Sequence, residues 1–79
     1  MEFNWKPEFH VTTDQTRIGS NVIWSDVFPI DDRFRWVIHI IPQSPEKEKR
    51  GVSDTFVEAI AVAESAMREI ATEIEAEAA

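Results

Sequence analysis

The chain has 79 residues, no cysteine and a formal net charge of −7. This length allows one domain with a small core, and the lack of cysteine excludes disulfides, thiolate metal sites and a cysteine nucleophile. A hydrophobic content of 43%, with three tryptophans and five phenylalanines, excludes a disordered chain. The sequence has no apolar stretch of about 18 residues and no signal-peptide pattern, so we expect a folded cytoplasmic protein.

Acidic residues are concentrated near the C-terminus. Residues 1–52 hold eight acids against seven bases, whereas residues 53–79 hold seven acids against Arg68 alone, which leaves −6 on the second segment. Such a field repels nucleic-acid phosphates and anionic lipids and attracts basic surfaces. We therefore expect no direct nucleic-acid binding and no membrane binding.

The first half of the chain predicts two strands. Residues 1–8 are expected to form a loosely attached N-terminal segment. Residues 9–13 are rich in β-formers and alternate, and this strand either ends at a turn or continues to Ile18. A turn signal at 19–21 is followed by a second strand over 22–28.

The third strand, over residues 34–41, has the clearest period-two pattern. One face carries Phe34, Trp36, Ile38 and Ile40, and the other carries Arg35, Val37, His39 and Ile41. Pro42 ends the strand because proline cannot donate to a ladder. Residues 42–52 are polar, with two prolines and a glycine, and predict a mobile polar loop.

Residues 53–79 predict an acidic amphipathic helix without an internal glycine or proline. Thr55 and Glu58 fit a capping box, and Ser53 is the alternative N-cap. The helical stripe consists of apolar residues spaced by three and four: Phe56, Ile60, Ala63, Met67, Ile70 and Ile74.

These elements predict an α+β fold in which a three-stranded antiparallel β-meander is packed on one face by a single C-terminal helix. One helix covers one face, so we expect the half-apolar opposite face to bind a partner or a second copy. The alternative is that Trp5 and the N-terminal segment fold back over it. Trp24 and Trp36 lie on neighbouring strands and are candidates to stack, with Trp36 in the core and Trp24 or Trp5 as an exposed anchor.

Residues that could support catalysis are sparse, and we expect neither an enzyme nor a cofactor. No nucleophile motif or phosphate-cradling glycine loop is present. His10 and His39 each fall on a predicted strand, where a structural role is usual. Asp31 and Asp32 with either histidine form the one metal constellation considered, and their spacing matches no recognised site.

Three glutamates give the helix its sharpest functional feature. Glu58, Glu69 and Glu73 share one flank, and Glu69 and Glu73 are about 6 Å apart along the axis, near the phosphate spacing of a nucleic-acid strand. We predict that this flank docks on the basic nucleic-acid-binding surface of another protein. The expected additional contacts from the sheet are Trp24, Arg35 and His39. The alternative is a solvated helix face that serves solubility.

The strand FRWVIHIIP followed by the helix VSDTFVEAIAVAESAMREI, with its Glu-Ala-Ile-x-x-Ala-x-x-Ala pattern, is similar to the sheet-and-helix half of HicB-type antitoxins. The turn at 42–45 departs from that family, and its DNA-binding extension is missing. This resemblance implies an antitoxin-like or homodimeric assembly module that binds through its sheet, around Val37 and Ile41.

In size, acidity and expected fold, the chain also resembles phage-encoded inhibitors of bacterial defence, including anti-CRISPR proteins. This resemblance is one of protein type and has no defining motif. It implies a non-catalytic inhibitor in the cytoplasm of a bacterial host, where an acidic surface blocks the nucleic-acid channel of a CRISPR effector.

Overall fold

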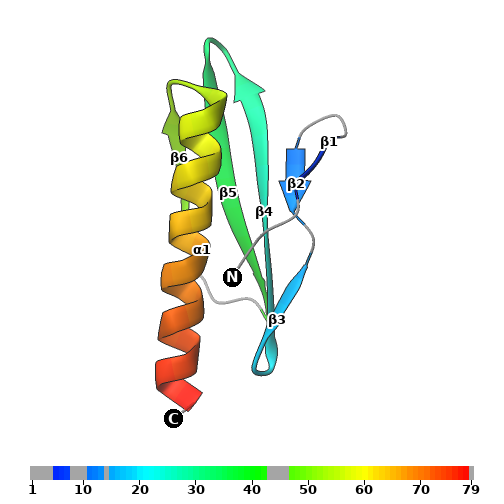
Figure 1. Ribbon diagram of the computed structural model, residues 1–79, viewed down its shortest axis with the longest axis vertical. Helices are drawn as coiled ribbons and strands as arrows, with labels where there is room; N and C mark the ends of the chain where they lie inside the picture. The colour runs from blue at the N-terminus through cyan, green and yellow to red at the C-terminus, as the bar shows by residue number, and fades with distance from the viewer. Residues whose placement is uncertain (1–4, 8–10, 14, 43–46, 79) are drawn as a thin grey trace.

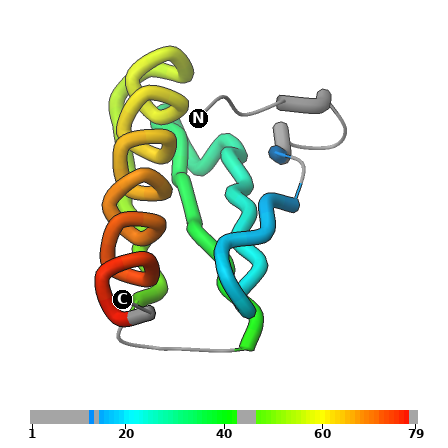
Figure 2. The backbone as a smooth tube through the Cα atoms, turned by 60° about the horizontal axis from the view of Figure 1, so that its bottom comes forward, coloured from blue at the N-terminus to red at the C-terminus, as the bar shows by residue number. Residues whose placement is uncertain are grey.

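A computed structural model describes residues 5–7, 11–13, 15–42 and 47–78 of the chain. These residues form one antiparallel sheet with a long helix packed across one of its faces (Figure 1). In chain order the elements are β1 (Trp5–Pro7), β2 (Val11–Thr13), β3 (Thr16–Ile18), β4 (Asn21–Ile30), β5 (Arg33–Ile41), β6 (Arg50–Ser53) and α1 (Phe56–Ala78). A second view shows α1 alongside β4 and β5 (Figure 2).

The sheet contains the predicted meander and additional strands. Its order is β1-β2-β4-β5-β6. β2 pairs with Asp26 and Val27 of β4, whereas β3 pairs with the first three residues of β4. Consecutive antiparallel pairing and the α+β class are as predicted, but the number of three strands was wrong. β1 lies within the segment expected to be loosely attached, and β6 lies at the end of the predicted loop 42–52. Both strands have four residues or fewer, too few for a period-two pattern to appear in the sequence.

A tight hairpin joins β4 to β5. Ile30 pairs with Arg33 across the turn residues Asp31 and Asp32, and Asp31 has a φ of 53°. Aspartate tolerates this left-handed conformation better than most residues. β4 runs through Pro29, beyond the predicted end at residue 28, because the N–H groups that bond to β5 belong to alternate residues of β4 and Pro29 is not one of them.

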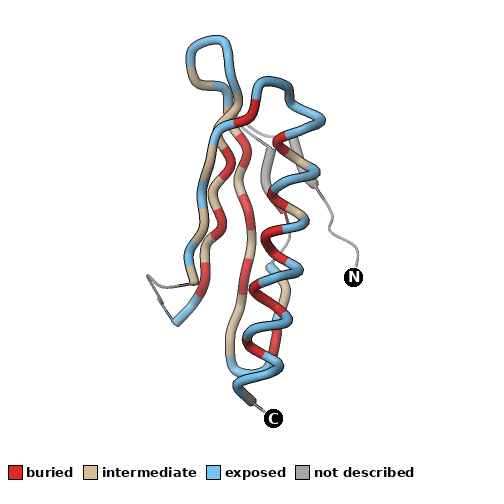
Figure 3. The backbone as a smooth tube through the Cα atoms, turned by 90° about the vertical axis from the view of Figure 1, so that its left-hand side faces the viewer, coloured by how far each residue is buried: buried red, intermediate tan, exposed pale blue. Residues whose placement is uncertain are grey.

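The hydrophobic core fills the space between α1 and the face of the sheet that it covers. In Figure 3, buried positions of α1 recur along its side toward the sheet. The predicted helical stripe is largely confirmed, because its four central and C-terminal members are buried and Ile60 is half-buried. Phe56 is the exception: it stays 39% exposed and packs edge-on against Phe34, with ring centroids 5.8 Å apart. The core comprises Ile18, Ile23, Val27, Trp36, Ile38, Ile40, Ala59, Ala63, Ala66, Met67, Ile70, Ala71 and Ile74.

Helix α1 begins with the predicted cap. The Oγ1 of Thr55 accepts a hydrogen bond from the backbone N–H of Glu58 at 3.1 Å, and its carbonyl accepts one from Ala59 at 3.0 Å. Thr55 is therefore the N-cap. Ser53, the alternative, is instead the buried last residue of β6.

Candidate functional site

The face of the sheet opposite α1 is covered by no element among the described residues. Antiparallel partners point to the same face, so the register assigns to it the even-numbered residues of β4 and β6 and the odd-numbered residues of β5. We call this surface the open sheet face. Its residues from these three strands are Val22, Trp24, Asp26, Phe28, Ile30, Arg33, Arg35, Val37, His39, Ile41, Arg50 and Val52.

The centre of the open sheet face is an ordered cluster of three side chains. His39 Nε2 lies 2.9 Å from Asp26 Oδ2. The ring of Trp24, the cross-strand partner of His39, stacks on the imidazole with centroids 5.0 Å apart and an interplanar angle of 24°. The carboxylate and the indole therefore hold the imidazole between them, which reduces the entropy that these side chains would lose on binding.

Aliphatic side chains flank this cluster toward both ends of the open sheet face. Ile41 is 52% exposed and Val52 is 43% exposed, while Val22 and Val37 are half-buried. Arg35, the cross-strand partner of Val52, is also half-buried. An ordered aromatic group among exposed aliphatic residues is typical of the central part of a protein interface.

A hydrogen-bonded carboxylate and histidine, such as Asp26 and His39, also occur in catalytic sites, where a nucleophile lies beside the histidine. Ser25, which follows Trp24 in the chain, is fully buried, and its Oγ donates to the carbonyl of Val37 at 2.9 Å. It is committed to the interior, where its N–H also donates to Thr13 Oγ1 at 2.8 Å. Within the described residues, no three histidine, aspartate or glutamate side chains converge as metal ligands. His10, one of the two histidines considered with Asp31 and Asp32, lies outside those residues.

The acidic flank of α1 contacts cations of the chain itself. Lys49 Nζ lies 2.8 Å from Glu69 Oε2 and 3.8 Å from Glu73 Oε1, and Lys47 Nζ lies 2.8 Å from Glu77 Oε1. The hydrogen bond to Glu69 raises the pKa of Lys49 above its ordinary value, with further support from the charge of Glu73. These lysines reach the helix because β6 returns the chain to the sheet beside α1, a contact that the sequence did not reveal.

The residues predicted to bind a partner divide into two groups. Trp24 and His39 are in contact on the open sheet face, and Arg35 lies on the same face opposite Phe28. On α1, Glu69 and Glu73 share Lys49, whereas Glu58 in the first turn is exposed and has no ion pair among the described residues.

The predicted stacking of the tryptophans was wrong. Trp24 pairs with His39, whereas Trp36 pairs with Val27, so the two indoles lie on opposite faces of the sheet. Trp36 belongs to the core as predicted. The side chain of Trp5 lies outside the described part of the molecule, so a covering role for it stays a prediction.

Asp26 and Val52 belong to the open sheet face but were missed in the sequence. The alternation Val22, Trp24, Asp26 contains a signal for the first, because it places the carboxylate beside the tryptophan on one face. Val52 had no such signal, since β6 was expected to be loop.

Comparison with protein-family models, with curated proteins and with solved structures found no significant match to this chain. Within the described residues, no helix combines the length and the hydropathy needed to cross a bilayer, although α1 has 23 residues. Function is therefore inferred from the residues and their geometry.

Proposed function

We propose that this chain is a non-catalytic assembly module whose open sheet face pairs with the same face of a second copy. The observation that carries the proposal is the ordered Trp24–His39–Asp26 cluster between exposed aliphatic residues on a face that α1 does not cover. Packing of two such faces would complete a layered structure in which each sheet is covered on both sides.

The position of the acidic helix favours the open sheet face over the rest of the surface as the site of self-association. The open sheet face carries Arg33, Arg35 and Arg50 against Asp26, whereas residues 53–79, which include α1, carry −6. Two copies that meet through this face would keep their acidic helices on the outside, at opposite ends of the assembly. Repulsion between the helices then disfavours other modes of association and leaves this one available.

The test is the molecular mass in solution by sedimentation equilibrium, for the wild type and for two matched variants. We expect a dimer that persists between about 0.1 M and about 1 M NaCl, because apolar burial is screened little by salt. Ile41→Lys places a charge among the exposed aliphatic residues of the interface, beside the central cluster, and should give a monomer. Val57→Lys makes the same change at a residue of α1 that is 76% exposed, and should leave the dimer intact.

A monomeric wild type at the highest soluble concentration would contradict the proposal. So would an Ile41→Lys variant that dimerises as well as the Val57→Lys control. Circular dichroism on the same samples separates loss of association from loss of folding.

A second candidate is the acidic inhibitor of anti-CRISPR type. The supporting observation is that the seven acids of residues 53–79 exceed the four cations that contact them, Arg33, Lys47, Lys49 and Arg68, so −3 remains after these contacts are counted. The contacts to Lys49 weaken this candidate, because docking on a basic partner would compete with an internal cation.

Two variants distinguish this candidate, with target-DNA cleavage by a CRISPR effector as the readout. Replacement of Glu58, Glu69 and Glu73 by glutamine should relieve inhibition. Lys49→Met should strengthen it, because the substitution removes the internal cation and leaves Glu69 and Glu73 available. An effector that is uninhibited by the wild-type chain, or inhibited equally by all three proteins, would count against it.

A further inference from the structure

Strand β6 is the terminal strand of the sheet in the described part of the chain, and its outer side is unpaired there. The backbone N–H of Ile38 donates to the carbonyl of Lys49 at 2.7 Å, which fixes the phase of the β5–β6 ladder. In an antiparallel ladder, opposed residues alternate between bonded and non-bonded pairs, so Gly51 and Ser53 face β5. The N–H and C=O groups of Arg50 and Val52 therefore point outward, where an added strand could bond to them.

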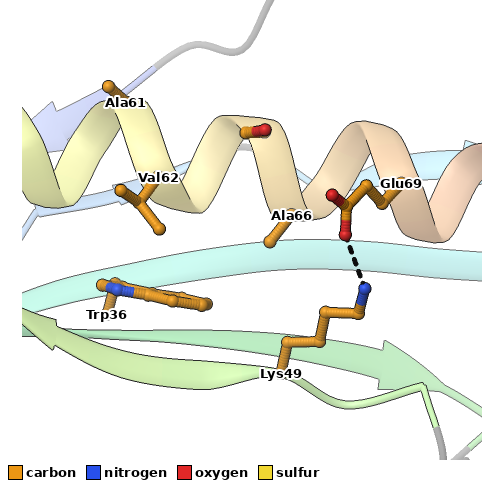
Figure 4. Close-up of a pocket in the computed structure, with 7 residues that line it drawn as sticks. Trp36, Lys49, Ala61, Val62, Ala66 and Glu69 are labelled. Carbon is orange, nitrogen blue, oxygen red and sulfur yellow. Dashed lines mark hydrogen bonds and ion pairs between the residues drawn. The ribbon is translucent and has the colours of Figure 1, made fainter.

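A groove of about 340 Å³ lies between Trp36 of β5 and α1, and Lys49, the residue before β6, also lines it. Figure 4 shows the indole of Trp36 lying beneath Val62 and Ala66, which form the helical wall. The Lys49–Glu69 ion pair closes one end. The floor is apolar, the wall is made of small side chains, and Val62 is 38% exposed at the rim.

The absence of a side chain at Gly51 allows the indole of Trp36 to lie against β6. A Cβ built on Gly51 would lie 2.6 Å from Trp36 Cζ2 and 2.8 Å from its Cε2. Any side chain at position 51 would therefore displace the ring. With glycine there, the aromatic floor of the groove extends to the strand whose outward N–H and C=O groups are available.

We propose that β6 and α1 form a binding site for an extended peptide that adds a strand to β6. Side chains of the added strand alternate between the two faces of the sheet. Those directed to the helix side enter the groove over Trp36 and should be apolar. Those directed to the opposite side meet a concavity lined by Arg35 and Arg50, and should be acidic. The occupant is therefore a segment in which apolar and acidic residues alternate.

Charge disfavours a second copy at this edge. Antiparallel pairing of two β6 strands around Gly51 would bring Arg35 and Arg50 of both copies onto one side of the joint. On the other side it would set the two acidic flanks, with Glu58 and Glu69, beside each other. An acidic and apolar peptide relieves the first of these clusters and does not create the second. This edge shares Arg35, Arg50 and Val52 with the open sheet face, but the outward backbone groups of β6 and the groove beneath α1 do not belong to that face. Val62→Glu therefore tests the edge without altering the open sheet face, and Ile41→Lys tests that face without altering the edge.

The test is titration of the folded chain with a synthetic probe, acetyl-Thr-Glu-Leu-Glu-Leu-Glu-Thr-amide. Binding is followed by calorimetry and by the amide shifts of β6 in nuclear magnetic resonance spectra. A probe of the same composition with its leucines adjacent is the control for alternation, and a lysine-for-glutamate probe is the control for charge. We expect the alternating acidic probe to bind best and to shift the amides of Arg50 and Val52 most.

Val52→Pro removes one outward N–H without removing a bond to β5, and should weaken probe binding by about tenfold or more. Val52→Ala, the matched control, retains the N–H group and should change affinity by less than about threefold. If Val52→Pro does not fold, Val62→Glu replaces it, since a carboxylate at the exposed rim of the groove should abolish binding. Arg50→Glu should reverse the preference toward the lysine probe.

Equal binding of the two acidic probes, or undiminished binding by both Val52→Pro and Val62→Glu, would overturn the proposal. Dimerisation that Val52→Pro abolishes and Ile41→Lys leaves intact would also overturn it, because this edge would then belong to a second copy.

Discussion

The two faces of the sheet are built from alternate residues of the same strands but have different surroundings. On the face beneath α1, Ile23 and Ile38 are fully buried. On the open sheet face, Val37 is half-buried and Ile41 is 52% exposed, although both are as apolar as their neighbours. Sheets that face water usually show polar residues on the solvent side, whereas strands covered on both sides are apolar throughout. The open face of β5 lies between these two cases, because it carries Val37 and Ile41 together with Arg35 and His39.

The largest expected effect comes from deleting side-chain volume on each face in turn. Ile38→Ala should lower the free energy of unfolding by about 2–5 kcal/mol, because it leaves a cavity beneath α1. Val37→Ala, one residue away on the open sheet face, should cost less than about 1 kcal/mol in the monomer, because the site is already partly solvated. Urea denaturation at low protein concentration measures both, and equal losses would contradict the described difference between the faces.

Gly51→Ala tests the close approach of β6 to the covered face. The new methyl carbon would lie 2.6 Å from Cζ2 of Trp36 in its present position, so the ring must move. Overpacking of this kind should cost about 1–3 kcal/mol. Tryptophan fluorescence and thermal unfolding report the change. Val52→Ala, the next residue of the same strand, is the control and should shift stability by much less. A stable Gly51→Ala protein with unchanged fluorescence would mean that Trp36 does not lie against β6.

The smallest effect is expected from the ion pairs along the acidic flank. The pKa of Lys49 is raised by Glu69, so while the carboxylate is ionised the pair contributes to folding fully below the ordinary lysine pKa of about 10.4, and the contribution is lost as pH rises through the raised pKa of Lys49. Because the pair is partly exposed, its contribution should be below about 1 kcal/mol. Lys49→Met should remove this part of the alkaline loss of stability, seen as a flatter profile of unfolding free energy above about pH 10 than in the wild type. Identical profiles would show that the contact does not stabilise the fold.

The sequence was sufficient for the elements whose pattern is local. The stripe of α1 and the alternation of β5 repeat over many residues, and the Thr55 cap depends on neighbours three and four residues away. Strand β6 has four residues and is defined by its pairing with β5, which no local pattern encodes.

The residues of the candidate site could likewise be predicted only where a local pattern places them. Trp24, Arg35 and His39 were predicted on the sheet, and the register of β4 and β5 brings them to one face. The contact of Lys49 with Glu69 spans 20 residues and depends on where β6 returns the chain, so the pairing of the acidic flank could not be predicted. The groove over Trp36 could not be predicted for the same reason, because β6 was expected to be loop.

The most direct test of the open sheet face is its accessibility as protein concentration rises. Methyl groups of Val37, Ile41 and Val57 can be followed by nuclear magnetic resonance with a soluble paramagnetic agent. Val37 and Ile41 should become protected from relaxation at high concentration, while Val57 on α1 stays fully accessible. Equal accessibility of all three methyl groups at every concentration would contradict the assignment of this face as the surface through which the chain associates.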